Sequence, residues 1–182
     1  DGGRESKLSF KGEQSGGEIS TLAEIQASHD GTADDQKGDL IFKTNDGSDN
    51  NVPTEAMRIE SGQNILVGQS STTTPVSGNT VGTALQSGGR LELTCDGNTP
   101  IRLNRKSSDG DIAQFRKDGS TVGSIGVTSG GSSSGLYIGD GDVGLELDDA
   151  NNAIYPYNTT TLSSSDNLID LCDSNKRFTD LY

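Results

Sequence analysis

The stretch DIAQFRKDGSTVGSI, residues 111–125, decides the fold class of this 182-residue chain. Two short runs in which apolar and polar residues alternate, 112–116 and 121–125, flank the dipeptide Asp118-Gly119. Alternation with a period of two residues is typical of a β-strand that buries one face. Asp-Gly suits a tight turn, because both positions tolerate a positive φ. The stretch therefore predicts a β-hairpin.

The same strand–turn–strand signal recurs along the rest of the chain. Asp-Gly occurs seven times, and short alternating runs lie between these pairs. Residues 18–28 fit either a short helix or a strand, and their glycine-rich flanks favour the strand. The sequence thus predicts an all-β meander. The further runs are 40–43, 56–60, 65–67, 91–95, 101–103, 136–138 and 144–147.

Composition narrows the classes of protein. The formal charge is −13, only 29 % of residues are hydrophobic, and Trp is absent. An acidic surface repels phosphate backbones, so we expect no nucleic-acid binding. No apolar run approaches the roughly 20 residues that a membrane helix needs, so we expect no membrane insertion. Two readings fit: a disordered acidic linker, or a β structure that completes its core with other chains; the regular alternation favours the second.

Cysteine and histidine give little sign of chemistry. Cys95 and Cys172 lie 77 positions apart, without a C-x-x-C pair or a Cys/His cluster. A zinc site is therefore not expected. The sequence predicts two small, part-buried thiols and leaves their pairing open. His29, the single histidine, stands beside Asp30-Gly31 and is predicted in a surface loop.

Several motifs resemble bacteriophage tail fibres. GDLIFKT (38–44) and EAMRI (55–59), within residues 31–68, are similar to the shaft repeats of such fibres. LNRKSSDGDIAQFRKDGSTVGSIG (103–126) resembles the segment that precedes their C-terminal intramolecular chaperone, of the endosialidase type. Two later stretches also resemble this segment, although the family commonly has Gly at the position of Cys172. These stretches are LYIGDGDVGLELDDANNAIYPYN (136–158) and IDLCDSNKRFTDLY (169–182).

The resemblance implies a fold and a role. Such fibres are elongated homotrimers, either an intertwined β-shaft or a triangular β-prism, whose apolar side chains meet on the threefold axis. The chaperone drives trimerisation and cleaves itself off, and its catalytic residues lie outside this sequence. We therefore expect no catalytic residue, no cofactor and no enzyme activity. The expected organisation is a shaft-like segment (1–69), a Ser/Thr/Gly-rich connector (70–89) and a distal segment (90–182) that ends where the chaperone would begin.

The expected function is structural and receptor-binding. The partners would be two further copies of the chain, a host cell-surface glycan or lipopolysaccharide, and other tail or fibre proteins. The protein would reside in the virion, exposed to the extracellular medium, after assembly in the host cytoplasm. Two alternatives stay open: a glycan-processing enzyme of the tailspike type, which would use two carboxylates about 5–10 Å apart, and a subunit of an extracellular β-filament.

Candidate site residues are few. Tyr137, Tyr155, Tyr157 and Asn158 could contact a sugar, because aromatic rings with a polar end stack on sugar rings; packing within the core is the alternative that burial statistics favour. Asp140, Asp142 and Asp148 could hold Ca²⁺, although they lack the EF-hand order, which favours solvated turns and no metal. A basic stretch could pair with acids of neighbouring chains or contact phosphate. Its residues are Arg90, Arg102, Arg105, Lys106, Arg116 and Lys117.

Overall fold

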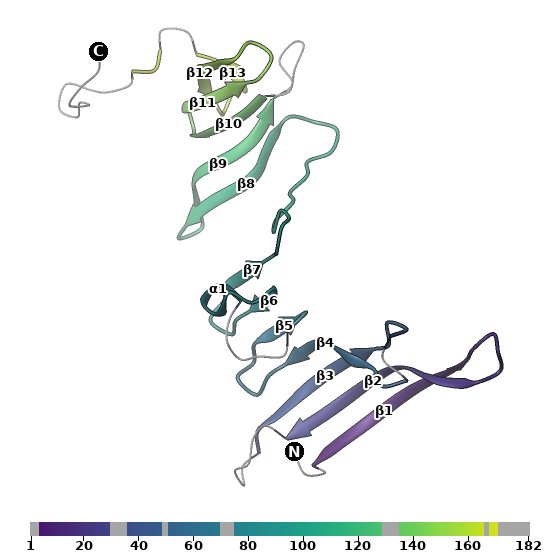
Figure 1. Cartoon of the computed structure of the whole chain (residues 1–182). Helices are drawn as coiled ribbons and strands as arrows, with labels where there is room; N and C mark the ends of the chain where they lie inside the picture. Colours follow the sequence, from purple (N-terminus) through teal and green to yellow (C-terminus); the bar gives the residue numbers. More distant parts are fainter. Residues whose placement is uncertain are drawn as a thin grey trace. The chain divides into compact units, whose positions relative to one another are not determined.

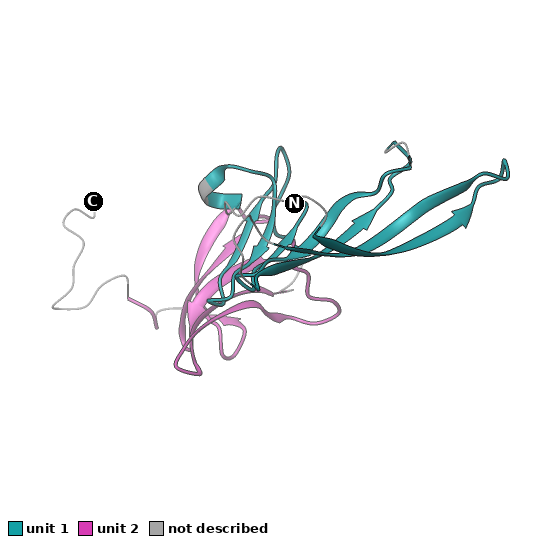
Figure 2. Ribbon diagram, turned by 90° about the horizontal axis from the view of Figure 1, so that it is seen from below, with its two compact units in different colours: residues 1–101 teal, residues 102–182 magenta. Residues whose placement is uncertain are grey.

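The protein consists of two compact units, residues 1–101 and residues 102–182 (Figure 1, Figure 2). The computed structural model describes residues 4–29, 36–48, 51–69, 75–128, 135–165 and 168–170. Each unit contains one antiparallel β-sheet whose neighbouring strands follow one another in the chain. The predicted all-β class is confirmed. Among the described residues no helix has the length and apolar character needed to cross a membrane.

The sheet of the first unit has seven strands in chain order. Residues 18–28, which fitted a helix or a strand, form most of β2, and the strand prediction is confirmed. His29 is the last residue of that strand and does not lie in a loop. The elements are β1 (Glu5–Glu13), β2 (Ile19–His29), β3 (Gly38–Thr44), β4 (Thr54–Ile59), β5 (Ile65–Val67), α1 (Pro75–Gly78), β6 (Gly82–Leu85) and β7 (Leu91–Thr94).

Three hairpin loops of the first unit share one design. They are Ser15-Gly16-Gly17, Ser61-Gly62-Gln63 and Ser87-Gly88-Gly89. In each, the third residue has a positive φ, at 89°, 64° and 82°. Its N–H donates to the carbonyl of the residue before the serine, at 2.8–2.9 Å. This is the geometry of a three-residue hairpin that ends in a left-handed residue, a position that favours glycine.

The two faces of the first sheet differ sharply. One cross-strand row of mixed polarity reads Lys7, Gln26, Ile41, Arg58, Leu66, Ala84 and Glu92. The two rows beside it point to the other face, because successive side chains alternate. Neither contains a charged residue, and together they define what we call the first apolar face. The large or half-exposed apolar residues of this face are Leu8, Ile25, Leu40, Phe42, Met57, Ile59, Ile65, Val67, Leu85, Leu91 and Leu93.

The sheet of the second unit has six strands in the order β13-β12-β11-β10-β9-β8. The hairpin predicted at Asp118-Gly119 is present: φ is 50° and 82° at these two residues, and Lys117 pairs with Ser120. Asp140 pairs with Val143, so the next tight turn is Gly141-Asp142. The strands are β8 (Gly110–Lys117), β9 (Ser120–Thr128), β10 (Gly135–Asp140), β11 (Val143–Asp148), β12 (Ala153–Asn158) and β13 (Ser163–Ser164).

This sheet also has one apolar and one polar face. Two cross-strand rows without any charged residue form the second apolar face, and its large side chains are half-exposed or exposed. The single row between them points to the opposite face and carries Asp111, Gly126, Tyr137, Glu146 and Tyr155. The second apolar face comprises Val127, Leu136, Leu147 and Ile154, with Ala113, Ile125, Ile138, Leu145 and Pro156 in the neighbouring row.

Several local features differ from the sequence prediction. The stretch expected as a connector, 70–89, contains α1 and β6, and the first sheet continues to β7. Residues 101–103 form no strand, whereas β6, β12 and β13 were not predicted. Cys95 is exposed and not part-buried, because it follows the last residue of β7. Cys172 lies outside the described residues.

Candidate functional site: the polar face of the second sheet

Two tyrosines form the centre of the polar face of the second sheet. Tyr137 on β10 and Tyr157 on β12 have exposed fractions of 0 % and 1 %. Their ring centroids are 5.4 Å apart with an interplanar angle of 22°, an offset-stacked arrangement. Gly126 makes room for the pair, because a Cβ at this position would collide with the Tyr137 ring. The glycine is thus required by close packing.

The hydroxyl ends of the two tyrosines differ. Tyr137 Oη donates to Asp111 Oδ1 at 2.7 Å. Burial, and then this hydrogen bond, raise the pKa of Tyr137 above its ordinary value. The hydrogen bonds from Gln114 and then from Tyr137 lower the pKa of Asp111, since they favour its charged form. Among the described residues Tyr157 Oη makes no hydrogen bond of ordinary geometry. Burial raises the pKa of Tyr157, and the nearby Thr128 side chain opposes that rise.

A hollow of about 350 Å³ opens beside Tyr157. Glu146 on β11 is one of its walls and is almost fully buried, with an exposed fraction of 8 %. Burial, and then the charge of Asp148, raise the pKa of Glu146, because both penalise the carboxylate. The remaining walls come from four strands, β9, β11, β12 and β13, and from two turns. The hollow is lined by Thr128, Glu146, Asp148, Asn151, Tyr155, Tyr157, Leu162, Ser163 and Ser164.

The four sugar-binding candidates have different surroundings. Tyr155 is half-buried and Tyr157 is buried, and both line this hollow. The ring of Tyr137 is covered and has no free face for a sugar in this structure. Asn158 holds a turn: its Oδ1 accepts from the N–H groups of Thr160 and Thr161 at 2.9 and 2.8 Å. Packing therefore accounts for Tyr137 and turn formation for Asn158, and sugar contact stays a prediction.

The calcium candidates lie at two ends of one strand. Asp140 is the last residue of β10 and Asp142 lies in the tight turn before β11, whereas Asp148 is the last residue of β11. Six residues of strand span about 20 Å, which is far beyond the reach of one ion. Asp148 Oδ1 already accepts from the N–H of Ala150 at 2.9 Å. In the described part of the chain no group of three His, Cys, Asp or Glu residues could hold a metal ion.

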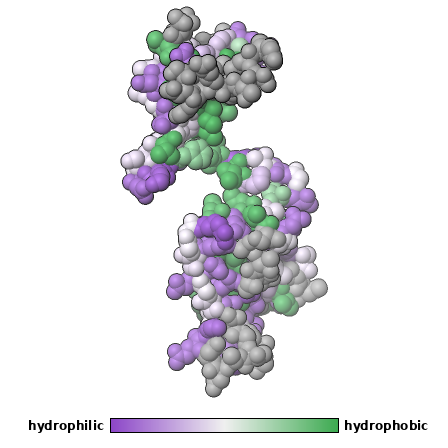
Figure 3. All heavy atoms as spheres, turned by 90° about the vertical axis from the view of Figure 1, so that its left-hand side faces the viewer, coloured by the Kyte–Doolittle hydropathy of each residue, from purple (hydrophilic) through white to green (hydrophobic). Residues whose placement is uncertain are grey.

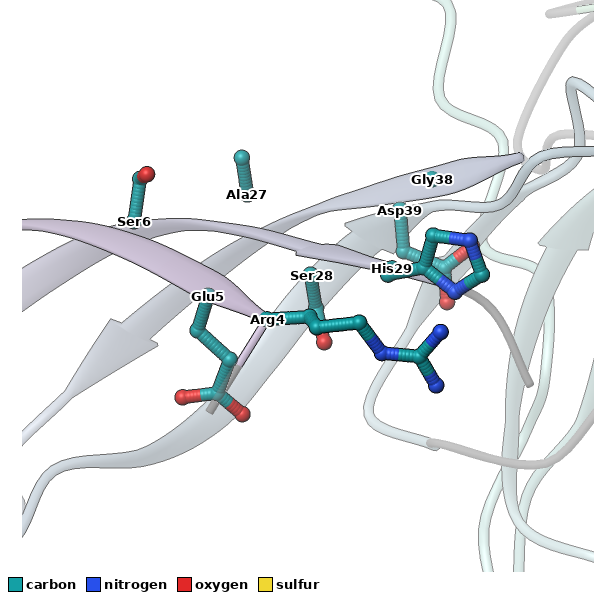
Figure 4. Close-up of a pocket in the computed structure, with 8 residues that line it drawn as sticks. All are labelled: Arg4, Glu5, Ser6, Ala27, Ser28, His29, Gly38 and Asp39. Carbon is teal, nitrogen blue, oxygen red and sulfur yellow. The ribbon is translucent and has the colours of Figure 1, made fainter. Parts of the chain in front are cut away.

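The first unit has a hollow at the start of β3. In Figure 4 the side chains of Arg4 and His29 lie on the same side as Asp39, while Ser6 and Ala27 point the other way. The Asp39 carboxylate is fully engaged: Oδ2 accepts from Arg58 Nη1 at 2.8 Å, and Oδ1 from the Ser61 N–H at 2.9 Å. This arrangement ties a hairpin loop to the neighbouring strand and supports a structural role.

Four members of the basic stretch make local contacts. Arg105 Nε donates to the Ser108 carbonyl at 2.9 Å, and Arg116 donates to the Gly119 carbonyl. Lys117 pairs with Asp118 at 2.6 Å, and Arg90 pairs with Glu92 at 3.0 Å. Exposed pairs of this kind contribute about 0–1 kcal/mol each. Pairing with neighbouring chains or with phosphate stays a prediction.

Comparison with known proteins yields no relative: no family model, no curated protein and no solved structure matches this chain. The site must therefore be interpreted from its own residues. Sequence reasoning singled out the tyrosines by their type but missed Glu146, Thr128 and Ser163 as walls of a hollow. The signal that could have found them is cross-strand register, since Glu146 stands opposite both Tyr137 and Tyr155.

Proposed function

We propose that this chain is a structural and receptor-binding, non-enzymatic segment of a phage tail fibre that works as a homotrimer. In this proposal three copies bury their apolar faces around a common axis as a β-shaft or β-prism. The polar faces then point outward, toward the host cell surface. The mature protein would reside in the virion after assembly in the host cytoplasm.

One observation carries the proposal: each unit has a sheet with an uncovered apolar face. On the second apolar face Leu136 is 46 % exposed and Ile154 is 66 % exposed. Figure 3 shows apolar residues at the surface among hydrophilic ones. Monomeric proteins rarely expose large contiguous apolar patches, and such patches mark interaction sites. Burial of these side chains would contribute roughly 25 cal/mol per Å² of apolar area.

Charge favours further copies of the chain as the partner. Each copy has a formal charge of −13, so the outer surfaces of two copies repel one another. The central rows of both apolar faces contain no charged residue, so contact through these faces keeps the acidic groups apart. In a closed assembly the long edge strand β1 would also pair with a strand of another copy, and paired edges resist aggregation. The motif resemblance to trimeric fibres sets the number of copies in the proposal at three.

Native mass tests the proposal directly. A homotrimer has a mass of 3 × 19.0 = 57.0 kDa, measurable by light scattering with an unboiled detergent gel beside it. The double variant Leu136→Lys with Leu147→Lys places two charges on the second apolar face and is expected to yield 19 kDa particles. The matched control, Ser15→Lys with Ser87→Lys, adds the same charges at exposed loop tips and should remain trimeric.

Three results would contradict the trimer. A wild-type chain that is monodisperse at 19.0 kDa removes the assembly. Equal dissociation of the face variant and the loop variant shows that general charge, and not the apolar face, governs association. A mass that grows with concentration without a limit instead indicates the extracellular β-filament.

A further inference from the structure

We propose that the hollow between Glu146, Tyr155 and Tyr157 is a binding subsite for an uncharged or amine-bearing sugar ring, and that it excludes phosphorylated and carboxylated glycans. The proposal rests on the receptor-binding role proposed above and deepens it. It assigns that role to one place on the polar face and narrows the class of glycan.

A buried hydroxyl without a partner is the first support. Tyr157 is 1 % exposed and lines the hollow, yet among the described residues its Oη makes no hydrogen bond of ordinary geometry, although the Thr128 side chain lies near it. Buried polar groups are nearly always hydrogen-bonded, and an unpaired one costs about 1–3 kcal/mol. A ligand hydroxyl in the hollow would satisfy this atom. The Thr128 side chain also lines the hollow, close to Tyr157, so one ligand hydroxyl could contact both residues.

The chemistry of the walls sets the kind of ligand. Two carboxylates, one amide and three aliphatic hydroxyls line the hollow, and no lysine or arginine is among its lining residues. Carboxylates accept hydrogen bonds from hydroxyl and ammonium groups. They repel phosphate and carboxylate groups, and the net charge of −13 adds to this repulsion at low salt. A polyol or an amino sugar fits, whereas an anionic glycan does not.

Aromatic and aliphatic surface completes the subsite. Tyr155 is half-buried, so part of its ring is available to the apolar C–H face of a sugar. Leu162, another lining residue, has a φ of 54°, which is unusual for a bulky residue. Leu162 also lines a second hollow of about 420 Å³, and because the walls of that hollow include Arg105, the exclusion of anionic groups is proposed only for the hollow beside Tyr157.

A glycan array with wild-type protein tests the ligand class. The array carries neutral hexose and N-acetylhexosamine oligosaccharides, glucosamine-containing ones, and phosphorylated and sialylated ones. We expect binding to neutral or amine-bearing members only. Binding confined to anionic members, or to none of the array, would overturn the proposal.

Variants test whether the glycan binds in this hollow. Glu146→Gln keeps the shape and removes the charge, and Tyr155→Ala removes the ring. We expect each to weaken the binding of the best array member at least tenfold, by titration of the protein with that glycan. The control Asp149→Asn removes a nearby exposed charge outside the lining and should stay within twofold. Unchanged binding by both Glu146→Gln and Tyr155→Ala, with circular dichroism as for wild type, would overturn the assignment.

The same samples separate this proposal from the trimer. Native mass is measured beside each titration. A trimer that binds no glycan disproves the subsite and leaves the assembly intact. A 19.0 kDa monomer that binds neutral glycan through Glu146 disproves the assembly and supports the subsite.

Discussion

The two sheets hold the side chains of their polar faces together by different kinds of contact. Each is an antiparallel meander with one uncovered apolar face and one polar face. In the first sheet the polar face is organised by charge: Arg58 bonds to Glu55 at 2.6 Å and to Asp39 at 2.8 Å. In the second sheet it is organised by two stacked tyrosines. The alternation of apolar and polar residues thus determines which face is apolar, while individual residues determine which contacts hold the polar face together.

The difference concerns how completely polar groups are satisfied. On the first sheet several buried polar atoms lack a partner, among them Gln26 Oε1, Glu60 Oε1 and Glu92 Oε2. On the second sheet the aromatic pair buries large rings and leaves only one such atom, Tyr157 Oη, among the described residues. Since all four tyrosines lie in residues 102–182, the tyrosine band of the near-ultraviolet circular dichroism spectrum reports the second unit, and hydrogen exchange reports both units.

The largest effect is expected from a substitution that removes the stacked tyrosine pair. Tyr137→Ala removes a fully buried ring and its hydrogen bond to Asp111. We expect the free energy of unfolding of the second unit to fall by about 3–5 kcal/mol, as for other large-to-small changes in cores. Hydrogen exchange of β10 and β12 should accelerate while that of β2 and β3 is unchanged. Loss of protection in both sheets would show that the units are not independent.

The next effect breaks the charged cluster of the first sheet. Arg58→Met leaves Asp39 and Glu55 without their cation, although their side chains are only 10 % and 15 % exposed. Full burial of an unpaired charge costs about 3–5 kcal/mol, and this partial exposure reduces our expectation to about 2–3 kcal/mol. The control Arg90→Met affects a side chain that is 67 % exposed and should cost under about 0.5 kcal/mol. Urea unfolding followed by hydrogen exchange measures both.

Acid should act on the second unit through Asp111. Hydrogen bonds from Gln114 and Tyr137 hold its pKa below the ordinary value in the folded state. The stabilisation is therefore present above the unfolded-state pKa, near 3.9, and is lost as pH falls through the folded-state pKa. Asp111→Asn should flatten the loss of the tyrosine signal as pH falls below about 4. An acid profile identical to wild type would remove Asp111 as the cause.

Glu146 makes the stability of the second unit depend on pH in the direction opposite to that of Asp111. Its pKa is raised by burial and by Asp148, so its contribution is greatest below the unfolded-state pKa and declines as pH rises through the folded-state pKa. Glu146→Gln, which removes this titration, should therefore make the second unit less sensitive to pH above about 4.3. Thermal unfolding of wild type and variant across pH 4–7 shows the difference.

The smallest effect sharpens the comparison of turns. The first unit uses the three-residue loops described above, in which Gln63 occupies the left-handed position that Gly17 and Gly89 occupy elsewhere. Gln63→Gly should stabilise the first unit by about 0.5–1 kcal/mol, because glycine adopts a positive φ without strain. The reverse change, Gly89→Gln, should destabilise it by a similar amount. Equal signs for the two variants would contradict the shared geometry.

The sequence predicts much of the fold because the signals are local. Alternation places most strands, and Asp118-Gly119 forms the expected turn with both residues at positive φ. Other Asp-Gly pairs behave differently: Gly110 begins β8, and Gly47 follows β3 in a bend. β12 escaped prediction because Pro156 lowers the strand signal. In the structure its carbonyl still accepts from the Ser165 N–H at 2.9 Å, although a proline has no N–H to donate to a neighbouring strand.

The site is less predictable than the fold because it depends on register. Tyr137 and Tyr157 are 20 residues apart and on strands separated by β11. Only the pairing of Tyr137 with Glu146, and of Glu146 with Tyr155, brings these side chains to one face. The two-residue alternation predicts that each tyrosine points to one face of the sheet, but it does not predict which residue of the neighbouring strand is paired with it.

The repeated hairpin loops make the first sheet extensible. Ser61 and Ser87 are 87 − 61 = 26 residues apart and occupy equivalent places in equivalent loops. The Ser61 N–H donates to Asp39 and the Ser87 N–H donates to Asn64, so each loop is fastened to the strand pair before it. Removing residues 60–85 would join Ile59 to Gln86, keep one complete loop and place Arg58 opposite Glu92. A sheet built in this way can change its width by whole strand pairs through in-frame duplication or loss, with the pattern of its two faces unaltered.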